Sequence, residues 1–175
     1  MSADPSFHHI SQDWFLDAIA RLVDALGRDS GWRPDWIVGI GRGGLVPAVY
    51  LSHATAIPLL SIDHSSAIPA FDSELVEKLA ARSRDGDRLL FVDDINDSGR
   101  TIASLREQLA ANSAPADGFR FAVLIDNATS RASVDYSAHG IDRTLVLDWF
   151  VFPWEAVSSS LRLADEARQH GETSR

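Results

Sequence analysis

The chain has 175 residues, of which 45% are hydrophobic and 23% are charged, as is typical of a single globular domain with a proper core. Its formal net charge of −9 and its single lysine, Lys78, disfavour broad binding to nucleic acids or membranes, which needs a basic surface. The absence of cysteine excludes disulfides and thiol chemistry. We expect a cytoplasmic protein, because no signal-peptide pattern and no apolar run of about 20 residues is found.

The first predicted helix follows a loose start at residues 1–10. Ser11 is suited to cap a helix that continues to about Gly27, because apolar residues recur there at helical spacing. After a proline, the apolar run Trp36–Ile40 predicts a buried strand. A glycine-rich loop then leads into a helix at Leu45–His53.

The glycines after the first strand allow two interpretations. Gly39, Gly41 and Gly44 fit the pattern G-x-G-x-x-G, and Asp63 ends the next predicted strand, Ile57–Ile62. This arrangement is found in dinucleotide-binding folds, where the acid binds a ribose. The fingerprint alone is weakly specific, and 175 residues are few for two mononucleotide halves and a substrate domain. The alternative is a loop that binds phosphate.

The rest of the chain continues the alternation of strands and helices. Apolar periodicity and turn residues predict a loop at 63–71, a helix at Asp72–Ser83, a strand at Leu89–Val92, a helix at Ile102–Ala111, a strand at Phe119–Ile125, short strands at Val134–Tyr136 and Thr144–Leu147, an aromatic segment at 148–155 and a helix at Val157–His170. This order favours an α/β fold with a mostly parallel sheet.

The most informative stretch is LLFVDDINDSGRT, which begins at Leu89. An apolar strand ends in Asp93 and Asp94, and Asp97 then opens a polar loop that leads into a helix. Such a loop lies at the carboxyl edge of a parallel sheet, where open α/β sheets bind ligands. Backbone N–H groups at a helix N-terminus suit a phosphate, and the acids suit sugar hydroxyls or Mg²⁺. Helix capping alone explains one or two polar residues but not three acids followed by Ser-Gly-Arg-Thr.

This stretch resembles the 5-phosphoribosyl 1-pyrophosphate (PRPP) signature of the type I phosphoribosyltransferases. Two further motifs in the right order extend the resemblance over residues 10–155. GIGRGGLVPA, which begins at Gly39, resembles the pyrophosphate loop of the 6-oxopurine enzymes. The pattern W-x-x-x-P-W-E, from Trp149 to Glu155, resembles the C-terminal segment of xanthine-guanine and archaeal-type purine phosphoribosyltransferases.

The resemblance implies one domain over residues 1–175 with the type I phosphoribosyltransferase fold. In this fold a central, mostly parallel sheet is flanked by helices and carries a small C-terminal hood. The core would span about 10–147, the hood about 148–156 and the last helix 157–170. Residues 63–71 would correspond in position to a flexible lid, and we expect a cis peptide around Gly41–Gly43.

The resemblance also implies a set of site residues. PRPP would be bound by Asp93, Asp94, Asp97, Ser98, Gly99, Arg100 and Thr101, and its pyrophosphate by Gly41, Arg42, Gly43 and Gly44. Asp97 would be the catalytic residue beside the purine N7. The base would be bound by Trp149 through stacking, Phe150 through its backbone, and Asn127. Asn127, or Asp126 if the register shifts by one residue, stands where the 6-oxopurine enzymes have a lysine. Mg²⁺ would be the cofactor, with Asp94 and Glu155 as ligands.

The implied reaction transfers ribose 5-phosphate from PRPP to hypoxanthine, guanine or xanthine and releases pyrophosphate, as in purine salvage. Relatives are commonly assembled as homodimers or homotetramers. Asn127 in place of a lysine leaves an alternative, a non-catalytic protein on the same fold that senses PRPP or a nucleotide. A response-regulator receiver domain fits poorly, because its lysine follows the acids, whereas Lys78 precedes them.

Overall fold

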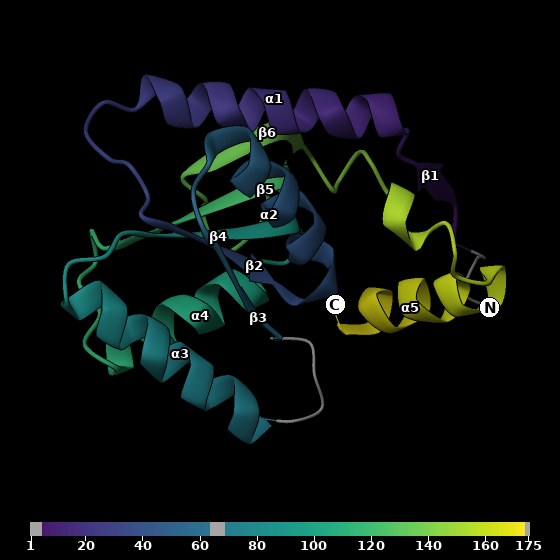
Figure 1. Ribbon diagram of the computed structural model, residues 1–175. Helices are drawn as coiled ribbons and strands as arrows, with labels where there is room; N and C mark the ends of the chain where they lie inside the picture. Colours follow the sequence, from purple (N-terminus) through teal and green to yellow (C-terminus); the bar gives the residue numbers. More distant parts are fainter. Residues whose placement is uncertain (1–4, 64–68, 174–175) are drawn as a thin grey trace.

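A five-stranded parallel sheet forms the centre of the computed structural model, which describes residues 5–63 and 69–173 (Figure 1). The strand order is β3-β2-β4-β5-β6. The strands are β2 (Trp36–Ile40), β3 (Leu59–Ile62), β4 (Leu89–Asn96), β5 (Phe119–Asn127) and β6 (Tyr136–Ile141). Every strand pair is parallel, which confirms the predicted α/β architecture.

Helices cover both faces of this sheet and bury a hydrophobic core on each. Helices α1 (Gln12–Arg28) and α2 (Gly41–Thr55) pack on one face, and α3 (Pro69–Arg84) and α4 (Arg100–Ala111) on the other (Figure 1). The residues Leu89–Val92 at the start of β4 are fully buried, because β4 is the central strand and both of its faces are covered. No helix in the described part of the chain is long and apolar enough to cross a membrane.

The strand order places a crevice between β2 and β4. From β2 the chain crosses to β3 at one edge, and from β4 it proceeds through β5 to β6 at the other edge. The loops that follow β2 and β4 therefore diverge at the carboxyl ends of these neighbouring strands. Ligands of open α/β sheets bind at such a switch point.

Some helix and strand boundaries lie where the local sequence predicts them, and others differ because a strand pairs with its neighbour over a longer stretch. The side chain of Ser11 accepts a hydrogen bond from the N–H of Trp14 at 3.1 Å, which confirms the predicted cap of α1. The strand predicted to end at Val92 continues to Asn96, because β5 runs beside it to its end and pairs Asn96 with Asp126.

The prediction of a strand at Thr144–Leu147 is wrong. The side chain of Asp142 accepts hydrogen bonds from the backbone N–H and the hydroxyl of Thr144, at 2.8 and 2.6 Å, which holds a turn instead. Leu145 and Leu147 are about 80% exposed, so their apolar character reflects no buried strand. The other short strand, predicted at Val134–Tyr136, begins only at Tyr136 and forms β6.

A second, two-stranded sheet joins a segment near the N-terminus to the segment that follows β6. β1 (Phe7–His9) pairs in parallel with β7 (Trp149–Val151), so the expectation of a loose start at residues 1–10 is wrong for these three residues. The short helix η1 (Pro153–Glu155) and helix α5 (Ser160–Thr173) follow β7. Within the predicted lid, residues 64–68 lie outside the described residues, and Pro69 already begins α3.

Candidate active site

Two adjoining cavities lie at the carboxyl ends of β2 and β4. The first has a volume of about 240 Å³ and is lined by the β4–α4 loop and the segment around β7. The second has a volume of about 690 Å³ and is lined by the β2–α2 turn, η1 and the start of α5. Four residues line both cavities: Asp93, Asp94, Thr101 and Glu155. The site is therefore one continuous cleft with acids at its centre.

The loop from Asp97 to Thr101 occupies one end of this cleft. Gly99 precedes α4 with a φ of 79°, and a Cβ there would lie 2.6 Å from both the hydroxyl of Ser130 and the N–H of Ala132. The close packing and the positive φ require glycine. Gly99, at the N-cap of α4, has no side chain to cap the helix, and the N–H of Arg100 donates to the hydroxyl of Ser98 at 3.5 Å. Within the described residues, the N–H groups of Thr101 and Ile102 remain for a ligand beside the cavity. Ser98, Gly99, Arg100 and Thr101, which the motif predicts to bind PRPP, all line the first cavity.

The glycine-rich turn after β2 occupies the other end. Gly41, Arg42 and Gly43 line the second cavity. A Cβ on Gly43 would lie 2.4 Å from Oδ2 of Asp94, so glycine allows the start of α2 to approach this carboxylate. Gly44 has a different role: a Cβ there would lie 2.1 Å from the carbonyl oxygen of Val92, so this glycine permits α2 to pack on β4.

The backbone of this turn corrects two expectations. Helix α2 begins at Gly41 directly after β2, four residues earlier than the predicted start at Leu45. No cis peptide bond is found in the described part of the chain, so the expected one around Gly41–Gly43 is not formed. The chain instead enters the helix through Gly41 with a φ of 55°, a conformation that glycine adopts readily.

The central acids carry more negative charge than their surroundings favour. Burial, followed by the charge of the adjacent Asp94, raises the pKa of Asp93 well above its ordinary value. Burial, followed by the charge of Glu155, raises the pKa of Asp94 to about 6. Burial also raises the pKa of Glu155, although the hydrogen bond from the N–H of Phe152 and, to a smaller extent, the charge of Arg42 partly offset this rise. A bound cation or hydroxyl donors would relieve this unfavourable charge.

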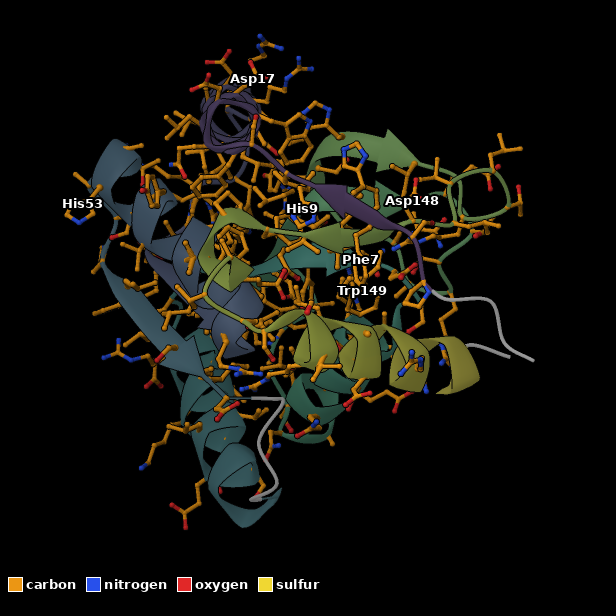
Figure 2. The ribbon with its side chains drawn as sticks, turned by 90° about the vertical axis from the view of Figure 1, so that its right-hand side faces the viewer. Phe7, His9, Asp17, His53, Asp148 and Trp149 are labelled. Carbon is orange, nitrogen blue, oxygen red and sulfur yellow. The ribbon has the colours of Figure 1, made fainter. Side chains whose placement is uncertain are left out.

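Aromatic side chains line the first cavity on the side of β7. Trp149, Phe150 and Phe152 contribute to its wall together with Asp97. The pairing of Phe7 with Trp149 fixes β7 in place, and the two residues lie side by side in Figure 2. The structure thus brings the predicted stacking residue and the predicted catalytic acid to one cavity.

Asn127 is not brought to the cleft. It is only 6% exposed, and its amide donates a hydrogen bond to the backbone oxygen of Asp97 at 2.9 Å. Its side-chain oxygen accepts hydrogen bonds from the N–H groups of Thr129 and Arg143, each at 3.1 Å. Asn127 lines neither cavity, so its predicted contact with the base is replaced by a role in positioning Asp97.

The sequence motifs did not indicate Arg143, which lines the first cavity. Its Nε and Nη2 donate to the two carboxylate oxygens of Asp97, at 2.9 and 3.1 Å. Its Nη1 donates to the backbone oxygens of Val146 and Asp148, at 3.2 and 2.7 Å. The guanidinium also lies 5.0 Å from the ring centre of Phe150. The local sequence Asp-Arg-Thr gives no sign that this arginine belongs to the site, because its main partner, Asp97, is distant in the sequence and is brought to it only by the fold.

Comparisons with known proteins identify the family. Residues 11–158 match the family model described as the phosphoribosyl transferase domain. The chain belongs to the phosphoribosyltransferase family. This match confirms the family and the fold that the three motifs indicated.

The relatives of this phosphoribosyltransferase include curated bacterial enzymes. The xanthine-guanine phosphoribosyltransferase of Cereibacter sphaeroides is 30% identical over 143 residues, which cover 79% of this chain and 78% of that protein. The enzyme of the same description from Roseobacter denitrificans is 28% identical over 160 residues and 84% of each chain. The crystal structure of a purine phosphoribosyltransferase from Pyrococcus horikoshii is similar with a TM-score of 0.62 and 25% identity, over 87% of this chain and 97% of that one.

Helix α5 of this phosphoribosyltransferase lies beyond the family match, which ends at residue 158. It nevertheless contributes to the cleft, because Arg162 lines the second cavity together with Arg42. The guanidinium of Arg162 is paired with Glu166 at 3.1 Å and is about half exposed. The motifs did not indicate this residue either, since a C-terminal amphipathic helix has no sequence signal for an anion site.

Proposed function

We propose that this phosphoribosyltransferase transfers ribose 5-phosphate from PRPP to a 6-oxopurine base in purine salvage and releases pyrophosphate. The observation that carries the proposal is the continuous cleft, in which two glycine-containing turns flank the same acids. An activated sugar phosphate has a phosphate at one end, hydroxyls in the middle and a pyrophosphate at the other end. The cleft offers the β4–α4 loop at one end, acids in the middle and the glycine-rich turn with Arg42 at the other end, in the same order.

In this proposal the β4–α4 loop binds the 5′-phosphate. The N–H groups at the start of α4 and the hydroxyls of Ser98 and Thr101 supply hydrogen-bond donors. Asp93 and Asp94 accept hydrogen bonds from the ribose hydroxyls. Arg42 and the glycine-rich turn bind the pyrophosphate, for which a guanidinium offers paired donors.

The base would occupy the first cavity. Trp149 stacks on its flat face, as aromatic rings prefer, and Phe150 presents its backbone to the ring edge. Asp97 lies in the same cavity and acts beside the purine N7 as the acid/base or electrostatic partner. The carbon of the ribose under attack then lies between the base and the departing pyrophosphate, over the shared acids.

Mg²⁺ is the cofactor in this proposal, and the donor set fits it. The described residues contain no group of three or more His, Cys, Asp or Glu that could hold a metal. Mg²⁺ commonly binds through one or two carboxylates and the phosphates of a substrate. Asp94 would be the first ligand, and Glu155 a second through its Oε1, since its Oε2 accepts the N–H of Phe152 at 2.9 Å. When bound, the metal neutralises charge on the departing pyrophosphate.

The decisive experiment measures pyrophosphate release from PRPP with hypoxanthine, guanine, xanthine, adenine and uracil in the presence of Mg²⁺. Release with a 6-oxopurine supports the proposal. Calorimetric binding of PRPP without release with any base would contradict it and support the alternative, a protein that senses PRPP. Failure to bind PRPP would contradict both.

The proposal also keeps three features that we expected from the sequence: a single domain, a cytoplasmic location and a homodimer or homotetramer. Leu145 and Leu147 are exposed large apolar side chains near the base end and are available for a subunit interface. Light scattering after size-exclusion chromatography measures the subunit number. A monomer at micromolar concentration would contradict the predicted assembly.

A further inference from the structure

The base end of the cleft contains one cation and one anion in direct contact. Arg143 and Asp97 both line the first cavity, and their side chains are 18% and 31% exposed. Arg143 makes four hydrogen bonds, two to Asp97 and two to backbone oxygens of the segment before β7. A guanidinium has five N–H groups, so one N–H of Nη2 has no acceptor in the described part of the chain.

The hydrogen-bonding character of Arg143 is fixed. An arginine only donates, and an ionised aspartate only accepts. A purine with an oxygen at position 6 presents a hydrogen-bond acceptor beside N7, whereas adenine presents an amino group that donates. The remaining N–H of Arg143 complements the oxygen. The amino group of adenine would meet the guanidinium donor to donor and leave both without a partner, which is costly in a partly buried site.

We infer that Arg143 determines base specificity by donating a hydrogen bond to the exocyclic oxygen of the base while holding Asp97 in place. The inference rests on the proposed function and adds the residue that distinguishes 6-oxopurines from 6-aminopurines. Asn127 does not supply this donor, because it is buried and lines neither cavity. Within the described residues that line the first cavity, the other arginine is Arg100, at the phosphate end.

A purely structural role for Arg143 is the competing explanation. The hydrogen bonds to Val146 and Asp148 attach the segment before β7 to the catalytic loop, and their loss would loosen the cavity for every base. The two explanations differ in one respect. A structural role lowers turnover with all bases alike, whereas a specificity role changes the ratio between them.

The test compares Arg143→Gln and Arg143→Lys with a matched control, Arg106→Gln. Arg106 also contacts a backbone oxygen, a carboxylate and an aromatic ring, those of Ser133, Asp135 and Phe121, but it lines neither cavity. For each protein, kcat/KM is measured with hypoxanthine and with adenine, and the melting temperature is recorded.

We expect Arg143→Gln to reduce the preference for hypoxanthine over adenine at least about 10-fold, because a charged donor to the oxygen is lost. Arg143→Lys keeps a cation that donates but not the paired contact with Asp97, so the preference remains while kcat falls. The preference is unchanged in Arg106→Gln. An equal loss with both bases in Arg143→Gln overturns the inference.

The same experiment separates this inference from the proposed function. If the parent protein transfers ribose phosphate to neither base, the proposed function fails. The inference is then tested by calorimetric binding of inosine and adenosine 5′-monophosphates to the parent and to Arg143→Gln. A parent without preference, or a preference that the variant retains, overturns it. If Arg143→Gln does not fold, loss of the preference in a folded Arg143→Lys overturns it.

Discussion

Replacement of Asp94 by asparagine should stabilise the protein at neutral pH and abolish its binding of PRPP. The pKa of Asp94 is raised from the ordinary 3.8 to about 6 by burial and by the charge of Glu155. The folded state therefore binds the proton of Asp94 more tightly than the unfolded state does. The contribution of this group to stability falls as the pH rises from about 4 to about 6 and stays low at higher pH.

The size of the effect follows from the two pKa values. A shift of one pKa unit corresponds to about 1.4 kcal/mol of folding free energy. The rise in the pKa of Asp94 from 3.8 to about 6 therefore destabilises the folded state by about 3 kcal/mol above pH 6. Since Asp94 faces a cavity that water enters, we take this as an upper limit and expect about 1 to 3 kcal/mol. Asparagine keeps a side-chain oxygen for the N–H of Ile95, which Asp94 accepts at 2.8 Å. For a chain of this length, 1 kcal/mol corresponds to about 2 to 4 °C in melting temperature.

The assay is thermal unfolding of the parent and Asp94→Asn without ligand at pH 4, 6 and 8. The melting temperature of the variant should exceed that of the parent at pH 8 by several degrees and converge with it near pH 4. Asp117→Asn, at an exposed position outside both cavities, is the control and should show no such dependence. A variant that is less stable than the parent at pH 8, or a gain that does not change with pH, would refute the reasoning.

Three further predictions concern the reaction. Asp97→Ala should lower kcat by about 10² to 10⁴-fold while calorimetry shows PRPP binding within a few-fold of the parent; unchanged turnover removes Asp97 from the chemistry. Gly43→Ala should weaken PRPP binding about 10-fold or more, since its Cβ would meet Asp94, whereas Gly140→Ala, with no atom within 4 Å of its Cβ, should leave it unchanged. Arg162→Ala should raise KM for PRPP several-fold at constant kcat for saturating base; an unchanged KM excludes α5 from the pyrophosphate end.

Local sequence signals sufficed for some of the elements and for the phosphate end of the cleft. The strand Trp36–Ile40 and the start of α1 were predicted correctly, because apolar runs and a capping serine determine them within a few residues. The loop from Asp97 to Thr101 is also predicted correctly, since a positive φ requires its glycine and it directly follows a strand that carries two adjacent acids, Asp93 and Asp94. Such features are determined by residues that are close together in the sequence.

The remaining features depend on partners far away in the sequence. β1 has three residues and no alternation of its own, and it forms only because Phe7 pairs with Trp149, 142 residues later in the chain. The apolar residues Leu145 and Leu147 predicted a strand, but the side chain of Asp142 holds a turn there. No pattern over a short window contains this information.

Asn127 and Arg143 together hold Asp97 in place. Asn127 fixes the backbone oxygen of Asp97 at 2.9 Å, and Arg143 fixes both oxygens of its carboxylate. A lysine at position 127 would bury an ammonium group at a site that is 6% exposed and would lose the acceptor that Asn127 offers to the N–H of Arg143. The two residues therefore act together, since Asn127 at the end of β5 helps to position Arg143, and Arg143 pairs with the carboxylate of Asp97. In the proposed reaction, an Asp97 that is positioned in this way before substrate binds needs little reorganisation.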